Sequence, residues 1–306
     1  MTNFQRRALT ATFFGAVMLI GMFWNEASFY VLFFIISMGC LWEFLKLIKE
    51  ESRLRKVFAL LLGSSLWLIS IFIRIVSLNG ESLQIGFGWH LVTYKVVFLP
   101  IILFVISPFF LLLFELFFQQ SEKPFINVGL LLLGIMYAIF PFVVFLPFLE
   151  FYSVDNHPFS YYFYESFKAI KALHFTPNIV AGILFLTWAN DSFAYIIGSK
   201  IGKTLLFPRV SPKKTWEGSI GGGIMCILTG ILIHQFLGIL TLVDWLVIGG
   251  IVAIFGSMGD LVESMFKRSV GVKDSGTFMP GHGGFLDRFD AFIFAIPFVF
   301  LYLMLK

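Results

Sequence analysis

Residues 264–290 read SMFKRSVGVKDSGTFMPGHGGFLDRFD, and the apolar run AFIFAIPFVFLYLM follows directly at residues 291–304. Packing alone does not require the mixture of cations, acids and glycines in the first stretch, which lies between two hydrophobic segments. We therefore interpret it as a site for phosphate groups and a metal ion at a membrane surface. Its cations are Lys267, Arg268, Lys273, Arg288 and, when protonated, His282; its acids are Asp274, Asp287 and Asp290, with Glu263 immediately upstream.

The composition places this stretch in an integral membrane protein. Hydrophobic residues make up 58% of the 306 residues and charged residues 13%, and the mean hydropathy is +0.91. Because about 20 residues are needed to cross the hydrocarbon core, we predict an all-α polytopic membrane protein with about nine transmembrane helices. The predicted spans are residues 8–24, 28–45, 57–76, 96–118, 126–149, 177–198, 217–240, 245–265 and 286–304.

Basic residues predict how the chain is oriented in the membrane. Most of the 22 Lys and Arg residues lie in the amino-terminal segment or in the loops that share its side in a nine-span topology. Since such residues favour the cytoplasmic side, we predict a cytoplasmic amino terminus and an external carboxyl terminus. This asymmetry accounts for much of the net charge of +4, so no nucleic-acid partner is needed to explain it.

The polar chemistry divides the chain into two predicted parts. Residues 1–176 would form the first five helices and the following loop, and residues 177–306 the catalytic last four. We found no functional group of residues in the first part, where Glu43 and Glu115 are interpreted as interfacial carboxylates.

Acidic side chains on three predicted helices lie at one depth. Asp191 is expected about 10 Å below the cytoplasmic end of its span, at 1.5 Å per residue. Asp260 and Glu263 share a helical face near the end of the eighth span, and Asp287 and Asp290 do so at the start of the ninth. Such a cluster repels itself and is costly to desolvate, whereas a hard divalent cation resolves both problems. We therefore predict a Mg²⁺ site.

Intramembrane ion pairs are the alternative interpretation, for example Asp287 with Lys267 or Asp191 with Arg288. Metal binding is favoured, because acids and cations in this number usually mark function in a membrane. Asp260 and Asp287 are our first choices for ligands, since each leads an acidic pair. The second choices, as ligands or as orienting outer groups, are Glu263, Asp290 and Asp191.

Two further segments could supply contacts to phosphate. In RVSPKKTWEG, residues 209–218, a helix is expected to begin near Trp216, so its amino terminus and the preceding side chains could bind an anion together. In PGHGG, residues 280–284, the glycines allow a close approach of backbone N–H groups, and His282 can donate a hydrogen bond. Taken alone, the lysines are more often topology signals and the glycines could form a helix cap. Residues 221–223, three glycines, are interpreted as a helix-packing surface.

The stretch 264–290 resembles the signature of the phosphatidate cytidylyltransferase (CDP-diacylglycerol synthase) family. The matching residues are Ser264, Lys267, Arg268, Lys273, Asp274, Gly276, Pro280, His282, Gly283, Gly284, Asp287, Arg288 and Asp290. NDSFAYIIGSKIGK, SPKKTWEG and SMGDLVES are similar to further blocks of that family, so the specific resemblance covers about residues 187–290. The length is similar to that of the bacterial form.

The resemblance implies transfer of a cytidylyl group from CTP to phosphatidic acid, with release of pyrophosphate, at the cytoplasmic side of a bacterial inner membrane. It also implies a two-cation centre, in which a monovalent ion such as K⁺ accompanies Mg²⁺, and it is the sole basis for expecting a homodimer. The predicted catalytic residues are Asp260, Asp287, Lys267, Arg268, His282 and Arg288. The predicted substrate contacts are Ser211, Lys213, Lys214, Thr215, Lys273, Gly283, Gly284 and Asn190.

Two other functions stay open at this level. A CTP-dependent polyprenol kinase, or an enzyme of archaeal ether lipids, would need a similar acidic and basic site. A transporter could use Asp191, Asp260 and Asp287 to bind a coupling ion. Three features disfavour transport: the acids cluster at one face, the glycine-histidine turn lies in a loop, and the sequence shows no evident inverted repeat.

Overall fold

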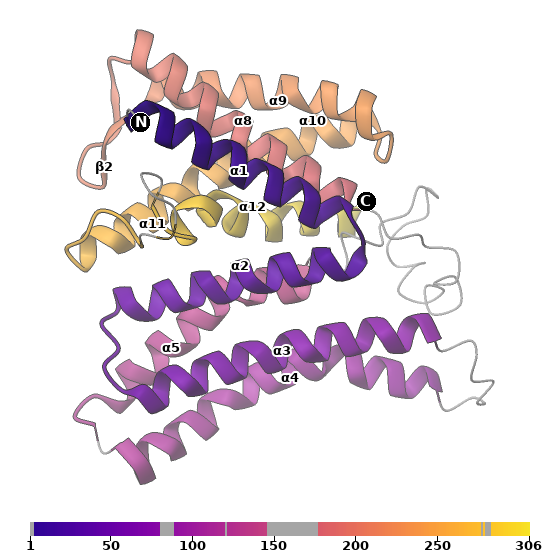
Figure 1. Cartoon of the computed structure of the whole chain (residues 1–306), viewed down its shortest axis with the longest axis vertical. Coiled ribbons are helices and arrows are strands. Elements are labelled where there is room, and N and C mark those ends of the chain that lie inside the picture. The colour runs from indigo at the N-terminus through magenta and orange to yellow at the C-terminus, as the bar shows by residue number, and fades with distance from the viewer. Residues whose placement is uncertain (1–2, 80–88, 120, 146–176, 277, 279–282) are drawn as a thin grey trace. The chain divides into compact units, whose positions relative to one another are not determined.

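The structure is a computed structural model, and it describes residues 3–79, 89–119, 121–145, 177–276, 278 and 283–306. Within these residues, eight helical segments are long and apolar enough to cross a membrane, which confirms an all-α polytopic membrane protein. The described chain forms two compact units (Figure 1). Unit 1 contains the residues up to Leu32 and those from residue 177 onward, and unit 2 contains residues 33–145.

Unit 2 is built from α3 and α4, α5 and most of α2, and two short π-helical turns extend α4 and α5. Buried polar contacts join its helices. The Trp67 indole donates to Ser37 Oγ over 2.8 Å, and Arg55 lies 2.9 Å from both Glu50 and Glu115. Glu115 is thus a buried ion-pair partner of Arg55. The bounds are α2 Glu26–Leu47, α3 Arg53–Asn79, α4 Trp89–Phe114, η1 Glu115–Gln119, α5 Pro124–Ala138 and η2 Pro141–Phe145.

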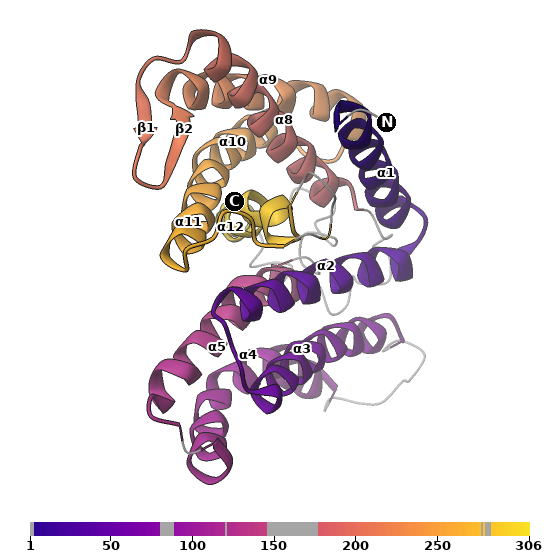
Figure 2. The same cartoon turned by 60° about the vertical axis from the view of Figure 1, so that its left-hand side comes forward.

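Unit 1 holds the last membrane helices, with α1 beside them (Figures 1 and 2). Phe14 of α1 has aromatic contacts to Trp188 of α8 and Phe289 of α12. The apolar part of α1, Leu9–Phe23, is shorter than the other candidate spans. The bounds are α1 Asn3–Phe23, α8 Asn178–Ile201, β1 Leu205–Phe207, β2 Ser211–Thr215, α9 Trp216–Leu237, α10 Leu242–Ile251, η4 Val252–Gly256, α11 Ser257–Ser269 and α12 Leu286–Leu305.

Glycines bring α8 and α9 into close contact. A Cβ on Gly222 would lie 2.8 Å from the Asn190 carbonyl oxygen, and a Cβ on Gly221 would lie 2.7 Å from Ile197. Small residues allow the backbones of membrane helices to approach one another. The predicted packing role of these glycines is therefore confirmed.

Two local features of unit 1 were not predicted. The eighth span is divided into α10 and α11 by the π-helical turn η4. The loop between α8 and α9 contains a two-stranded antiparallel hairpin, in which Leu205 is opposite Thr215 and Phe207 is opposite Ser211. Both features flank the polar residues considered next.

Candidate active site

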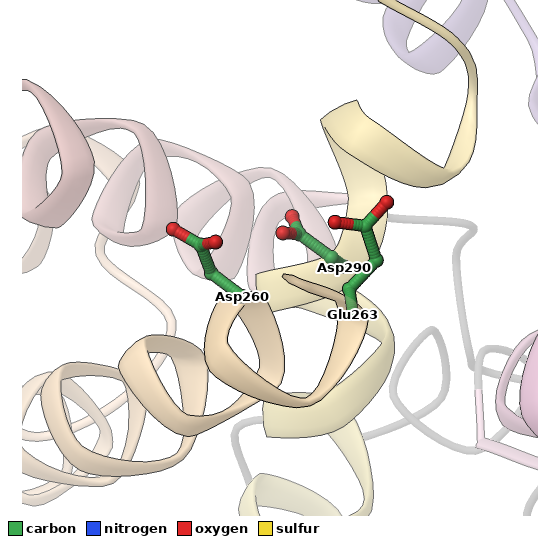
Figure 3. A group of neighbouring side chains, drawn as sticks. All are labelled: Asp260, Glu263 and Asp290. Atoms are coloured by element: carbon green, nitrogen blue, oxygen red, sulfur yellow. The ribbon is translucent and has the colours of Figure 1, made fainter. Parts of the chain in front are cut away.

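Three carboxylates meet where α11 packs against α12. One oxygen each from Asp260, Glu263 and Asp290 lies within 4.8 Å of the others, and Figure 3 shows the three side chains close together. Glu263 is 1% exposed and Asp290 7%. Asp260 and Glu263 come from one face of α11, as their spacing predicted. The convergence of Asp290 with them is a property of the folded helix pair.

Gly259 explains why the two helices can come this close. A Cβ at this position would lie 2.6 Å from the Asp290 carbonyl oxygen and 2.6 Å from Phe294 Cβ. A side chain would therefore push α11 and α12 apart. The glycine directly before Asp260 allows the contact that gathers the carboxylates.

Two lysines lie against this acidic cluster. Lys214 Nζ, from β2, is 2.6 Å from Asp260 Oδ2, and Lys267 Nζ is 2.5 Å from Glu263 Oε2. Glu263 Oε1 is buried and has no hydrogen-bond partner among the described residues. Glu263 and Asp290 are buried and Asp260 is partly exposed. Two ammonium groups only partly offset these three carboxylates, so the cluster can accept further positive charge.

The donor set fits a hard divalent cation. Mg²⁺ prefers carboxylate and water oxygens and commonly keeps open positions for substrate phosphate. Asp260, Glu263 and Asp290 supply three carboxylates from two helices, and one buried oxygen has no partner. Asp191, on α8, interacts electrostatically with Asp260 and Asp290 but is exposed at the surface of the described chain.

Asp287 has a different environment from the three-carboxylate cluster. One of its oxygens lies 2.5 Å from Lys267 Nζ, while the other accepts hydrogen bonds from Ser275 N and Oγ at 2.9 and 2.8 Å and from Gly284 N at 2.7 Å. The alternative ion pair with Lys267 is thus present. Asp287 connects α11, the loop that follows it and the start of α12. The Lys267 ammonium group lies 2.5 Å from both Asp287 and Glu263.

The glycine turn before α12 is shaped around Asp287. Gly283 has φ of 84°, a conformation that side chains rarely adopt. The Gly284 N–H group, which we predicted to approach phosphate, donates to the Asp287 carboxylate. His282, Pro280 and Gly281 lie outside the described residues, so their predicted roles remain predictions.

The predicted phosphate segment is only partly directed at the cluster. Helix α9 begins at Trp216, as expected, and Thr215 caps it by accepting a hydrogen bond from Gly218 N at 3.2 Å. Lys214 reaches Asp260, whereas Lys213 is exposed and Ser211 is half-buried.

The remaining predicted residues lie around this centre. Arg268 is exposed and donates to the Val272 carbonyl oxygen at 2.9 Å. Lys273 and Arg288 are exposed, and Arg288 interacts electrostatically with Asp191. Asn190 is buried and donates to Ser257 Oγ at 3.2 Å.

Three contributors were missed in the sequence. Ser275 is 6% exposed and makes two hydrogen bonds to Asp287; it lies within the polar stretch, but serines in loops are common. Ser257 positions Asn190, and Gly259 sets the helix spacing. Glycine immediately before an intramembrane acid was the one available signal for Gly259.

The fold and this centre define a class: a helical membrane protein with a cluster of acidic and basic side chains where α11 packs against α12. The comparison with known families agrees with that class. A model described as the Cytidylyltransferase family matches residues 5–306, and the chain belongs to this family.

Three similar proteins share the name phosphatidate cytidylyltransferase. A phosphatidate cytidylyltransferase of Bacillus subtilis (strain 168) is 35% identical over 190 residues, 61% of this chain and 61% of that protein. Proteins of the same name from Staphylococcus haemolyticus (strain JCSC1435) and Staphylococcus aureus (strain COL) are 50% identical over 114 residues and 43% identical over 138. Those matches cover 37% and 44% of this chain. The three matches span 61%, 44% and 50% of the relatives' own lengths.

Proposed function

We propose that the protein transfers the cytidylyl group of CTP to phosphatidic acid, producing CDP-diacylglycerol and pyrophosphate for phospholipid synthesis. The observation that carries the proposal is the carboxylate cluster with Lys214 and Lys267 in contact with it. Membership of the Cytidylyltransferase family and the name shared by the relatives support it.

In the proposed reaction, an oxygen of the phosphatidate phosphate forms a bond to the α-phosphorus of CTP. The bond from that phosphorus to the bridging oxygen breaks, and pyrophosphate leaves with the electron pair. The attacking phosphate is ionised at neutral pH, so no strong general base is needed. Since both reactants are anionic, the chain's main tasks are charge neutralisation and alignment.

The basic residues perform the charge neutralisation. Lys214 and Lys267 already lie at the acidic cluster. There they can exchange their ion pairs with carboxylates for contacts with substrate phosphate oxygens. The exposed cations around the site would bind the remaining phosphate charge: Lys213, Arg268, Lys273 and Arg288. His282 is proposed as a further phosphate contact.

Asp260, Glu263 and Asp290 would hold Mg²⁺, which when bound supplies positive charge to the phosphate groups. Asp287 stays in the proposed ligand set because a single ammonium group lies between it and Glu263. Asp191 is proposed to orient the site from α8. A monovalent ion such as K⁺ is proposed as the second cation, on the basis of family resemblance.

The proposed setting is a bacterial cytoplasmic membrane, crossed nine times, with the amino terminus and the site facing the cytoplasm. The distribution of basic residues supports this orientation. Water-soluble CTP and a membrane-bound lipid phosphate can meet at that boundary. A homodimer is proposed from the family resemblance.

The test is turnover by purified protein in detergent with phosphatidic acid and CTP, with and without Mg²⁺, following both products. The proposal expects equal, Mg²⁺-dependent formation of CDP-diacylglycerol and pyrophosphate. Formation of CDP without pyrophosphate would instead indicate a CTP-dependent kinase. No consumption of CTP by folded protein would refute the enzymatic proposal and favour transport.

A further inference from the structure

The β1–β2 hairpin presents apolar side chains at the ends of two membrane helices. Leu205 and Phe207 of β1 are 46% and 52% exposed, whereas Leu206 between them is half-buried. Ile201 and Trp216, at the base of the hairpin, are 59% and 51% exposed. Apolar and aromatic side chains at this level of a membrane protein are typical of the boundary between hydrocarbon and headgroups.

The charge of the same segment favours an anionic surface. Residues 199–216 contain no Asp or Glu, and Lys203, Arg209 and Lys213 are exposed. Clusters of basic residues next to membrane helices are attracted to anionic lipid headgroups. Exposed apolar side chains and exposed cations on one short hairpin match the two layers of a lipid surface.

The hairpin is held firmly to the helices. The Glu217 carboxylate accepts hydrogen bonds from the backbone N–H groups of Lys203 and Thr204, each at 3.1 Å, and Trp216 N donates to the Thr204 carbonyl oxygen at 2.9 Å. Strand β2 contacts α8, α9 and α11, and β1 lies on its outer side (Figure 2). The apolar face of β1 is therefore presented by a fixed support.

From these observations we infer that the hairpin docks into the headgroup layer of an anionic leaflet. Leu205 and Phe207 enter the boundary of the hydrocarbon, and Lys203 and Arg209 contact lipid phosphates. Lys214, the neighbour of Lys213, reaches inward to Asp260, so the hairpin connects the lipid surface with the acidic cluster. The docking itself does not require cytidylyl transfer; its effect on turnover rests on the proposed lipid substrate.

Spin labels can measure this docking in the full chain reconstituted into phosphatidylcholine vesicles with and without phosphatidylglycerol. Cys40 and Cys226 are buried, so they should react little with the label. The unsubstituted chain measures that background. Labels at Leu205→Cys and Phe207→Cys report depth through their relative accessibility to oxygen and to a water-soluble nickel complex. Glu51→Cys, at an exposed polar position, is the aqueous control.

Leu228→Cys supplies the deep control, because Leu228 lies within α9 and is 47% exposed. We expect both hairpin labels to lie between the two controls, deeper in anionic than in neutral vesicles. The double variant Lys203→Gln/Arg209→Gln should lose that dependence on lipid charge. Hairpin labels as accessible to nickel as the aqueous control would overturn the inference, as would labels shielded from both reagents, which would indicate contact with protein.

Turnover separates this inference from the proposed function. The double variant Leu205→Ser/Phe207→Ser should raise the KM for lipid roughly tenfold, since it removes two partly buried apolar side chains from the lipid boundary, and leave the KM for CTP unchanged. Correct label depth in a chain without transferase activity would refute only the proposed function. An equal rise of both KM values would contradict a specific role in lipid docking.

Discussion

Replacing Gly259 by alanine should disrupt the site without removing any charged group. The added Cβ would lie 2.6 Å from both the Asp290 carbonyl oxygen and Phe294 Cβ, whereas ordinary contact begins at 3.4 Å. Relieving the overlap of about 0.8 Å, the difference between those distances, requires α11 and α12 to separate. Asp290 then moves away from Asp260 and Glu263. Misplacement of about 1 Å in a catalytic site can lower the rate by about 100-fold.

Gly256→Ala is the matched control, at the last residue of η4, which directly precedes α11 and also lies beside α12. Its Cβ would meet Ala291 Cβ at 3.6 Å, which is ordinary contact. We expect Gly259→Ala to lose about 100-fold in kcat, with destabilisation of ~1–3 kcal/mol from overpacking, and the control to stay near the parent in both. Turnover with saturating CTP and lipid, together with thermal unfolding in detergent, measures these effects. A folded Gly259→Ala protein with parental kcat and Mg²⁺ dependence would refute the idea that helix spacing sets the cation site.

Three further substitutions test other parts of the site and fold. Asp287→Asn should lower turnover about 100-fold at every Mg²⁺ concentration while the protein stays folded; retained activity would remove this carboxylate from the centre. Lys214→Ala should raise the KM for CTP about tenfold, equivalent to ~1.4 kcal/mol. The control variant Lys213→Ala should raise it less. Equal KM values for the parent and Lys214→Ala would mean that Lys214 is only a topology signal. Arg55→Met breaks a buried ion pair and should lower the free energy of unfolding by about 3–5 kcal/mol. Arg53→Met, at an exposed position, should change it little. Similar melting temperatures for the two variants would argue against the buried network.

The membrane fold was predictable because the thickness of a bilayer sets the length of apolar segments. The start of α9 was predictable for a chemical reason: Thr215 can cap the backbone N–H groups that a helix leaves unpaired. The pairing of Asp260 and Glu263 on one face followed from helical periodicity. Each of these features depends on residues close together in the chain.

The features that were missed leave no clear pattern in the sequence. The donors to Asp287 come from Ser275 and Gly284, which the loop after α11 and the turn before α12 bring to it. The strands of the hairpin span three and five residues, too few for a clear alternating pattern. The π-helical turn at Val252–Gly256 consists mostly of apolar residues that also suit an α-helix.

The proposed cation binding and the packing of α11 depend on the same residues. Its buried positions are Gly259, Glu263 and Lys267, so a glycine, a carboxylate and an ammonium group occupy the positions where most helices bury apolar side chains. Apolar burial can therefore contribute little to this contact, and the charges gathered there must be neutralised for α11 to pack on α12. A bound cation would supply that neutralisation. The π-helical turn η4 precedes these residues, and such turns often occur at functional sites. The residues that would hold the cation are thus the same residues that determine whether the helix pair closes.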